Sequence, residues 1–265
     1  MYLLLITVLC FGLHLGRRCN MGGVTSRHLP GVVGASATSQ FNVYNVGDTT
    51  SLFAVDINRG YVDSTLDDDN VRLFKKSSLN PQWEKIENNA GIIIKPQERI
   101  YVRADKASSY RNTVYVDVLT GNDYARSELS LEGDITSLFF DETQTHIQYH
   151  FRGESVCYAD QLLLPENTPE NVEFAFAFYN CVNLRTAPIL RDINPHSDCY
   201  YKMFYECSSL QSITVHFTDW GDDGAYFTEG WVEDVAENGI FRCPSALPEI
   251  RGESYIPDSW TIERF

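Results

Sequence analysis

Two histidines are the first candidates for chemistry in this 265-residue chain. His146 and His150 stand four residues apart, a spacing that can hold one zinc ion when both residues lie on a helix. The segment 145–151, however, alternates between polar and apolar side chains, as a strand does. On a strand the two imidazole rings are too far apart to share a metal ion. We therefore expect no metal site here, and an exposed polar strand face.

The cysteines also lack the spacing of a metal site or a redox pair. They include no C-x-x-C pair, and an odd number does not suit a disulfide scaffold; they are Cys10, Cys19, Cys157, Cys181, Cys199, Cys207 and Cys243. A nucleophilic cysteine needs a neighbouring base, which no motif supplies. We expect reduced, buried cysteines that pack as small apolar residues.

Acidic residues are abundant but form no specific catalytic pattern. Asp67–Asp69 lacks the spacing and the glycine of an EF-hand loop and predicts a solvated turn. Adjacent carboxylates such as Asp222-Asp223 and Glu233-Asp234 are common in an acidic region and give no positive support for a glycosidase. The chain has no G-x-S-x-G elbow, Walker A loop or dinucleotide fingerprint. We therefore expect a protein that is not an enzyme, with no catalytic residues and no cofactor.

Charge is distributed unevenly along the chain. Residues 1–126 contain 14 Lys and Arg against 12 Asp and Glu, whereas residues 127–265 contain 7 against 24. The acidic C-terminal half repels phosphate backbones, so we expect no nucleic-acid partner. Solubility of a crowded, displayed surface and cation-dependent adhesion both remain open explanations of this charge.

Residues 1–38 are expected to form an apolar leader and a flexible linker. Met1–Leu15 has the length of a signal-peptide core, but no positive charge precedes it, and Arg17-Arg18 follow it. Cys19 has no lipobox before it. Three alternatives stay open, which are a true start at Met21, an atypical export signal and a membrane anchor.

Residues 39–126 have the pattern of a β-sandwich of immunoglobulin-like size. Short runs of β-favouring residues are separated by turn residues; these runs are 41–46, 51–56, 71–75, 83–86, 92–95, 100–104 and 114–118. The C-terminal residues 127–265 instead contain an internal repeat. Phe178–Leu184 recurs 26 residues later as Phe204–Leu210.

This repeat predicts a short leucine-rich-type solenoid of stacked coils. Phe, Cys and Leu would fill a narrow core, followed by extended stretches at 185–189 and 211–217. Two coils expose apolar faces and need a cap, which we place in a helix over 230–239 with Trp231 and Val235 on one face. The expected fold is thus mainly β with some α: a sandwich, a short solenoid and a capping helix.

Several of these segments resemble BspA-like leucine-rich repeat proteins of Bacteroides and their phages. The resemblance rests on Cys199–Leu210, Gly230-Trp231 with the residues that follow, and Ile256–Thr261. The region 70–138, with Trp83 and the run 99–104, resembles the domain that often precedes such repeats. The chain departs from the pattern in its few repeats and in the Pro-containing stretch 242–252.

The resemblance implies display on a virion or a bacterial surface, without catalysis. We expect a virion appendage of the head- or tail-fibre type that binds a host surface protein or glycan and other virion proteins. A bacterial surface adhesin and a carbohydrate-binding module are the alternatives, and homo-oligomer formation is open. Tyr201, Tyr205 and Trp220 are the candidate ligand-binding residues, whereas Tyr200 and Phe204 are expected to point inward.

Overall fold

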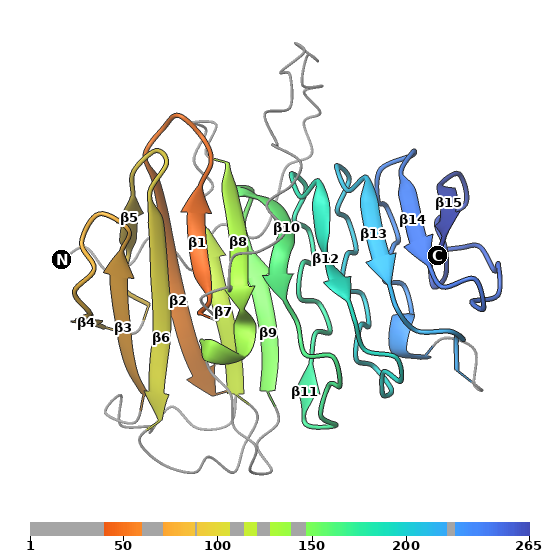
Figure 1. The fold of residues 1–265 in the computed structure, drawn as a ribbon, viewed down its shortest axis with the longest axis horizontal. Helices are drawn as coiled ribbons and strands as arrows, with labels where there is room; N and C mark the ends of the chain where they lie inside the picture. Colours follow the sequence, from red (N-terminus) through yellow and green to blue (C-terminus); the bar gives the residue numbers. More distant parts are fainter. Residues whose placement is uncertain are drawn as a thin grey trace. The chain divides into compact units, whose positions relative to one another are not determined.

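Alternating apolar and polar residues form strands throughout the part of the chain that the computed structural model describes. This part comprises residues 40–59, 71–87, 89–106, 114–120, 128–138, 147–221 and 226–265, all within one unit, Ala37–Phe265. The expectation of a mainly β protein is confirmed (Figure 1). The described residues form no α-helix, and their helical turns are the 3₁₀ turns η2 (Ile135–Ser137) and η3 (Tyr226–Thr228).

Every strand expected from residues 39–126 is present. These strands are β1 (Asn42–Asn45), β2 (Ser51–Arg59), β3 (Val71–Ser77), β4 (Glu84–Ile86), β5 (Ile92–Ile94), β6 (Arg99–Lys106) and β7 (Val114–Thr120). Within β6, Ile100 and Val102 are buried while Tyr101 and Arg103 are partly exposed. Successive side chains point to opposite faces of a strand, so this alternation places one face of β6 in the core.

The C-terminal half contributes further strands. They are β8 (Leu129–Asp134), β9 (Ile147–Arg152), β10 (Val156–Leu163), β11 (Val172–Glu173), β12 (Thr186–Leu190), β13 (Ser212–Val215), β14 (Ile240–Cys243) and β15 (Thr261–Arg264). The extended stretches expected near 185–189 and 211–217 correspond to β12 and β13. In this half, β10, β12, β13, β14 and β15 pair in parallel, side by side (Figure 1).

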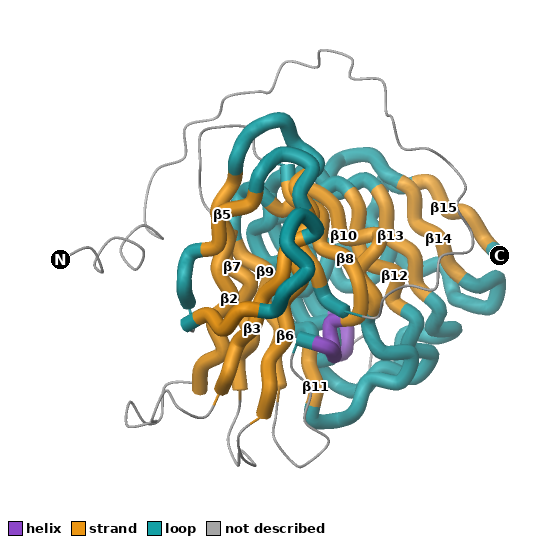
Figure 2. Tube along the Cα trace, turned by 60° about the vertical axis from the view of Figure 1, so that its left-hand side comes forward, coloured by secondary structure: helices purple, strands orange, loops and turns teal. Residues whose placement is uncertain are grey.

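The strands form two sheets (Figure 2). Buried side chains of both sheets belong to one hydrophobic cluster. One sheet has ten strands in the order β15-β14-β13-β12-β10-β8-β1-β6-β3-β4, and the other has five in the order β11-β9-β7-β2-β5. Pairing is antiparallel around β1, β2, β3 and β6. It becomes parallel from β8 to β10 and from β7 to β9. Because β1 pairs with β8, one sheet continues across the expected boundary at residues 126 and 127.

The turns that precede β12 and β13 repeat the same backbone conformation. Phe176 and Lys202 are equivalent by the 26-residue offset, and both have a positive φ, of 58° and 48°. The backbone N–H groups of one turn donate to the carbonyls of the next at 2.8 Å: Phe176 to Tyr201, Phe178 to Met203 and Asn180 to Tyr205. The turns are therefore held together by hydrogen bonds between backbones, as neighbouring strands are.

Buried aromatic rings stack from β9 onto these turns and from one turn to the next. One ladder joins Tyr149, Phe174 and Tyr200, with ring centroids 5.5 and 6.4 Å apart. A second ladder joins Phe151, Phe178 and Phe204 at 4.7 and 5.7 Å. The inward orientation expected for Tyr200 and Phe204 is confirmed, because their exposed fractions are 1% and 0%.

The helix expected over residues 230–239 is absent, and the prediction is wrong. The start of this segment continues a third stacked turn, in which Gly230 and Asp234 have positive φ values of 62° and 58°. The preceding turn donates to its carbonyls: Lys202 to Glu229, Phe204 to Trp231 and Glu206 to Glu233, at 3.0, 2.9 and 2.9 Å. Left-handed residues and carbonyls bonded to a neighbouring turn are incompatible with an α-helix.

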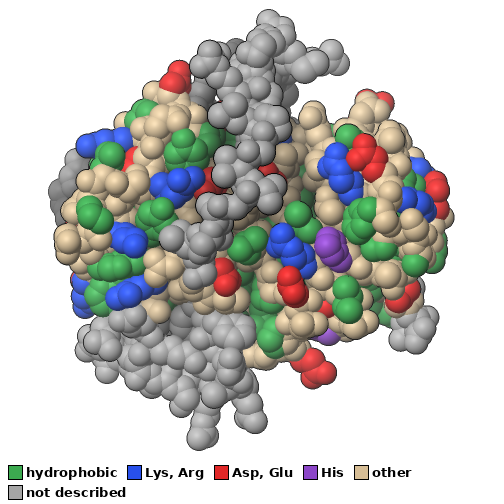
Figure 3. All heavy atoms as spheres, in the orientation of Figure 1, with side chains coloured by type: hydrophobic (Ala, Val, Ile, Leu, Met, Phe, Trp, Pro, Cys, Tyr) green, Lys and Arg blue, Asp and Glu red, His purple; other side chains and the backbone are tan. Residues whose placement is uncertain are grey.

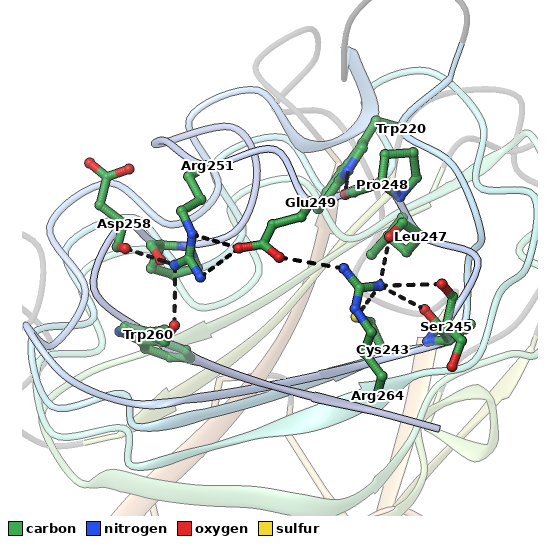
Figure 4. Close-up of polar contacts among 12 residues, drawn as sticks. Trp220, Cys243, Ser245, Leu247, Pro248, Glu249, Arg251, Asp258, Trp260 and Arg264 are labelled. Atoms are coloured by element: carbon green, nitrogen blue, oxygen red, sulfur yellow. Dashed lines mark hydrogen bonds and ion pairs between the residues drawn. The ribbon is translucent and has the colours of Figure 1, made fainter.

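Two arginines secure the C-terminal end of the ten-stranded sheet instead (Figure 4). Nη1 of Arg251 donates to the carbonyl oxygens of Pro257, Asp258 and Trp260 at 3.1, 2.7 and 3.1 Å. Nη1 of Arg264 donates to the carbonyl of Leu247 at 2.7 Å. Ion pairs join both guanidinium groups to Glu249, at 3.0 and 3.9 Å. These bonds satisfy carbonyl groups that lie in turns rather than in a strand.

Within the described residues, no helix is long and apolar enough to cross a membrane. The expected leader, residues 1–38, and the turn at Asp67–Asp69 lie outside the described residues.

Candidate binding surface

Of the two candidate histidines, His150 lies within the described residues and His146 lies outside them. His150 is 4% exposed, so the expectation of an exposed strand face is wrong at this position. Its Nδ1 lies 3.0 Å from a carboxylate oxygen of Asp117 on β7, and Nε of Arg152 lies 3.4 Å from the same oxygen. The neighbouring strand β7 thus supplies a carboxylate that satisfies a buried imidazole. The described residues contain no group of His, Cys, Asp and Glu that could hold a metal ion.

The described cysteines are buried and form no disulfide, in agreement with the expectation of packed thiols; they are Cys157, Cys181, Cys199, Cys207 and Cys243. Sγ of Cys181 donates to the carbonyl of Phe151, and Sγ of Cys207 donates to the carbonyl of Phe178, both at 3.0 Å. Burial raises the pKa of Cys157 to about 11 and that of Cys181 to about 12. These thiols stay protonated at neutral pH, which disfavours nucleophilic chemistry.

A group of aromatic side chains lies on the outer side of the stacked turns. We call Phe176, Tyr179, Tyr201, Lys202 and Tyr205 the aromatic turn surface. The rings of Tyr179 and Tyr205 are stacked at 4.9 Å with an interplanar angle of 1°. The ring of Tyr201 packs edge-on against Phe176 at 5.1 Å. Tyr179 and Tyr205, which are equivalent by the 26-residue offset, thus lie at the spacing of neighbouring strands.

The rings of this surface differ in how much of each face is open. Phe176 and Tyr179 are 39% and 40% exposed, and Tyr201 and Tyr205 are partly exposed. The ring of Tyr205 contacts both the ring of Tyr179 and the ammonium of Lys202, whose Nζ is 5.1 Å from the Tyr205 ring centroid. The ring of Tyr205 covers one face of the Tyr179 ring. A ligand can reach the part of the Tyr179 ring that remains exposed.

A glycine explains the position of Lys202. Gly230 is the residue of the third turn that is equivalent to Lys202. A Cβ atom built on Gly230 would lie 3.4 Å from both Cγ and Cε of Lys202. The lysine stem therefore occupies the space beside a residue without a side chain, and its Nζ is also 5.5 Å from the ring centroid of Tyr201. The stem packs on apolar surface while the ammonium stays near water.

Acidic residues continue the surface into the third turn. Glu233 of the third turn occupies the position equivalent to Tyr205. Glu206 directly follows Tyr205 in the sequence. The negative charge of Glu233 is the main cause that raises the pKa of the Tyr205 hydroxyl, and desolvation and Glu206 add to it. The hydroxyl therefore remains a hydrogen-bond donor at neutral pH.

Trp220, the third candidate from the sequence, is not part of this surface. Its side chain is 4% exposed, and its Nε1 donates to the carbonyl of Pro248 at 2.9 Å. Its ring packs against Phe217 at 5.3 Å and Tyr255 at 5.3 Å. The expected surface location is wrong because the indole fills the core beside the third turn.

Phe176 and Tyr179 were missed as surface candidates in the sequence. Tyr179 is equivalent to Tyr205 by the 26-residue offset, so the repeat itself contains the signal that identifies it. Phe176 has no such signal, because its equivalent is Lys202 and its exposure follows from the left-handed turn. Comparisons with protein-family models, curated proteins and solved structures found no match to this chain.

Proposed function

We propose that this chain is a non-enzymatic, displayed binding protein that recognises a glycan through the aromatic turn surface. The observation that carries the proposal is the exposed ring of Tyr179, which is 40% exposed and is held by its stacking on Tyr205. Sugar rings present C–H groups that pack on aromatic rings and hydroxyl groups that bond to polar neighbours.

The rigidity of the surface supports binding without reorganisation. Tyr179 and Tyr205 lie on turns joined by backbone hydrogen bonds, including the 2.8 Å bond from Asn180 to Tyr205. Their rings are already ordered by stacking, so little side-chain entropy is lost when a ligand binds. Phenol hydroxyls and the Lys202 ammonium supply hydrogen bonds beside the rings.

The proposed protein combines two kinds of β architecture in one chain. We infer an immunoglobulin-like sandwich, formed by β1 to β7 with β8 and β9, that continues into a short leucine-rich-type solenoid. Parallel pairing from β10 to β15 and the stacked turns support the solenoid. The resemblance to BspA-like proteins supports placement on a virion appendage, with a bacterial surface adhesin as the alternative.

A glycan array probed with the full chain tests the proposed activity. Tyr179→Ala combined with Tyr205→Ala should reduce binding to the best ligand about tenfold or more, since aromatic contacts of this kind contribute about 1 kcal/mol each. Tyr226→Ala is the matched control, because Tyr226 is 54% exposed but lies outside the aromatic turn surface. Equal binding by the double variant and the control would refute the proposal.

Location is tested separately by mass spectrometry of purified phage particles and of washed host envelopes. Peptides in the particles support a virion appendage. Peptides in the envelope alone support a bacterial adhesin and contradict the virion placement.

A further inference from the structure

Cationic side chains lie over aromatic rings on the outer face of β3 and β6. Nζ of Lys76 is 4.8 Å from the ring centroid of Trp83 and 5.0 Å from that of Tyr101. The guanidinium carbon of Arg103 is 4.6 Å from the centroid of Trp83 and 5.4 Å from that of Phe74. We call these five residues the cation–aromatic patch. On the face drawn in Figure 3, Lys and Arg side chains alternate with hydrophobic ones where β3 and β6 lie in Figure 1.

The strand register assembles this patch. Lys76 is directly opposite Tyr101 in the antiparallel pair of β3 and β6, and Phe74 is opposite Arg103. The side chains that alternate with them, such as Leu73 and Val102, are 0% exposed and belong to the core. All five members of the patch are partly exposed. The alternation therefore points two cations and three rings away from the core.

Lys76 differs from neighbouring cations in its electrostatic partners. Arg99 forms an ion pair with Glu132 at 2.6 Å, and Lys75 forms one with Glu84 at 2.9 Å. Among the described residues, the ion pairs do not include Lys76, whose ammonium contacts aromatic rings. A cation–π contact positions the ammonium without neutralising it, so its N–H donors remain available to an anion.

We propose that the cation–aromatic patch binds an acidic polysaccharide, whose carboxylates pair with Lys76 while its sugars contact the rings. This site is separate from the aromatic turn surface and does not depend on it. The charge of the patch complements such a ligand. Duplex DNA carries about one charge per 1.7 Å of its axis and needs a larger array of cations, whereas this chain has a net charge of −15. A polymer of lower charge density suits a single ammonium group beside aromatic rings.

Calorimetric titration of the full chain with polygalacturonate, in calcium-free buffer at physiological salt, tests this site. Fully methyl-esterified polygalacturonate is the matched ligand, because it keeps the sugars but lacks the carboxylates. Lys76→Gln should weaken binding about fivefold, and the methyl ester should bind much more weakly than the acid. Lys95→Gln removes the same charge at an exposed position outside the patch and should bind as the wild type does.

Three results would overturn the proposal: no binding of polygalacturonate, equal binding of the acid and the ester, or equal loss in Lys76→Gln and Lys95→Gln. Self-association without polysaccharide that Lys76→Gln abolishes would also overturn it, in favour of a second copy as the occupant. Tyr179→Ala should leave this titration unchanged, so failure of the proposed glycan surface and failure of this site are distinguishable.

Discussion

Replacing Cys181 with alanine should change how the stability of the protein responds to alkaline pH. Burial raises the pKa of this thiol from 9.0 to about 12. The unfolded chain therefore loses the thiol proton at a lower pH than the folded protein does. The stabilising contribution of the protonated thiol is complete below pH 9 and is lost as the pH rises toward 12.

The size of this effect follows from proton linkage. Each pH unit inside the window lowers the free energy of unfolding by about 1.4 kcal/mol per thiol. Between pH 8 and pH 10.5, Cys181 alone should lower it by about 2 kcal/mol. Cys181→Ala should be less stable than the wild type at pH 8, because it removes a buried side chain from the core. Alanine does not titrate, so the stability of this variant lacks this pH dependence. The difference between the two proteins should then narrow as the pH rises.

Urea unfolding followed by far-ultraviolet circular dichroism, under reducing conditions and at several pH values in this range, measures the effect. Val215→Ala is the control, because Val215 is 0% exposed and has no titrating group. It should lower stability equally at every pH. If the stabilities of Cys181→Ala and the wild type fall in parallel between pH 8 and pH 10.5, the thiol does not have the raised pKa that its burial implies.

Two further substitutions test the C-terminal end of the sheet. Gly239→Ala should lower the free energy of unfolding by about 2 kcal/mol, because the new Cβ would lie 2.6 Å from the ring of Trp260. Gly91→Ala, whose Cβ would meet the flexible end of Leu52 at 3.2 Å, should cost much less in the same denaturation assay. Arg251→Met should lower stability by about 1 to 2 kcal/mol and speed amide hydrogen exchange in β15, because three carbonyl groups lose a donor. Unchanged exchange in β15 would show that Arg251 does not secure this end.

Local sequence patterns were sufficient to predict the repeat, the strands of residues 39–126 and the extended stretches at β12 and β13. They did not predict β8, β10, β11, β14 or β15. Alternation of apolar and polar residues over runs such as 100–104 reports which side chains face a core, because side chains on a strand have a period of two. The 26-residue offset likewise predicted that Tyr200 and Phe204 point inward, since equivalent positions in stacked turns share one environment. The same offset also identifies Tyr179 as a surface candidate, because Tyr179 is equivalent to Tyr205.

Features that depend on distant partners were not predicted. His150 is buried because Asp117 on a neighbouring strand satisfies it, and no pattern around residue 150 reports that partner. The segment 230–239 has helix-like spacing, yet its carbonyl groups bond to the turn before it.

The sequence by itself thus determined the strand positions in residues 39–126, the repeat period and the inward rings, because each depends on residues close together in the chain. Only the tertiary structure decided which strands pair, that β1 and β8 join both halves in one sheet, and which rings and cations meet on a surface. Pairing between strands far apart in sequence depends on the whole set of competing registers and buried faces. A local sequence pattern limits the possible registers but does not select one of them.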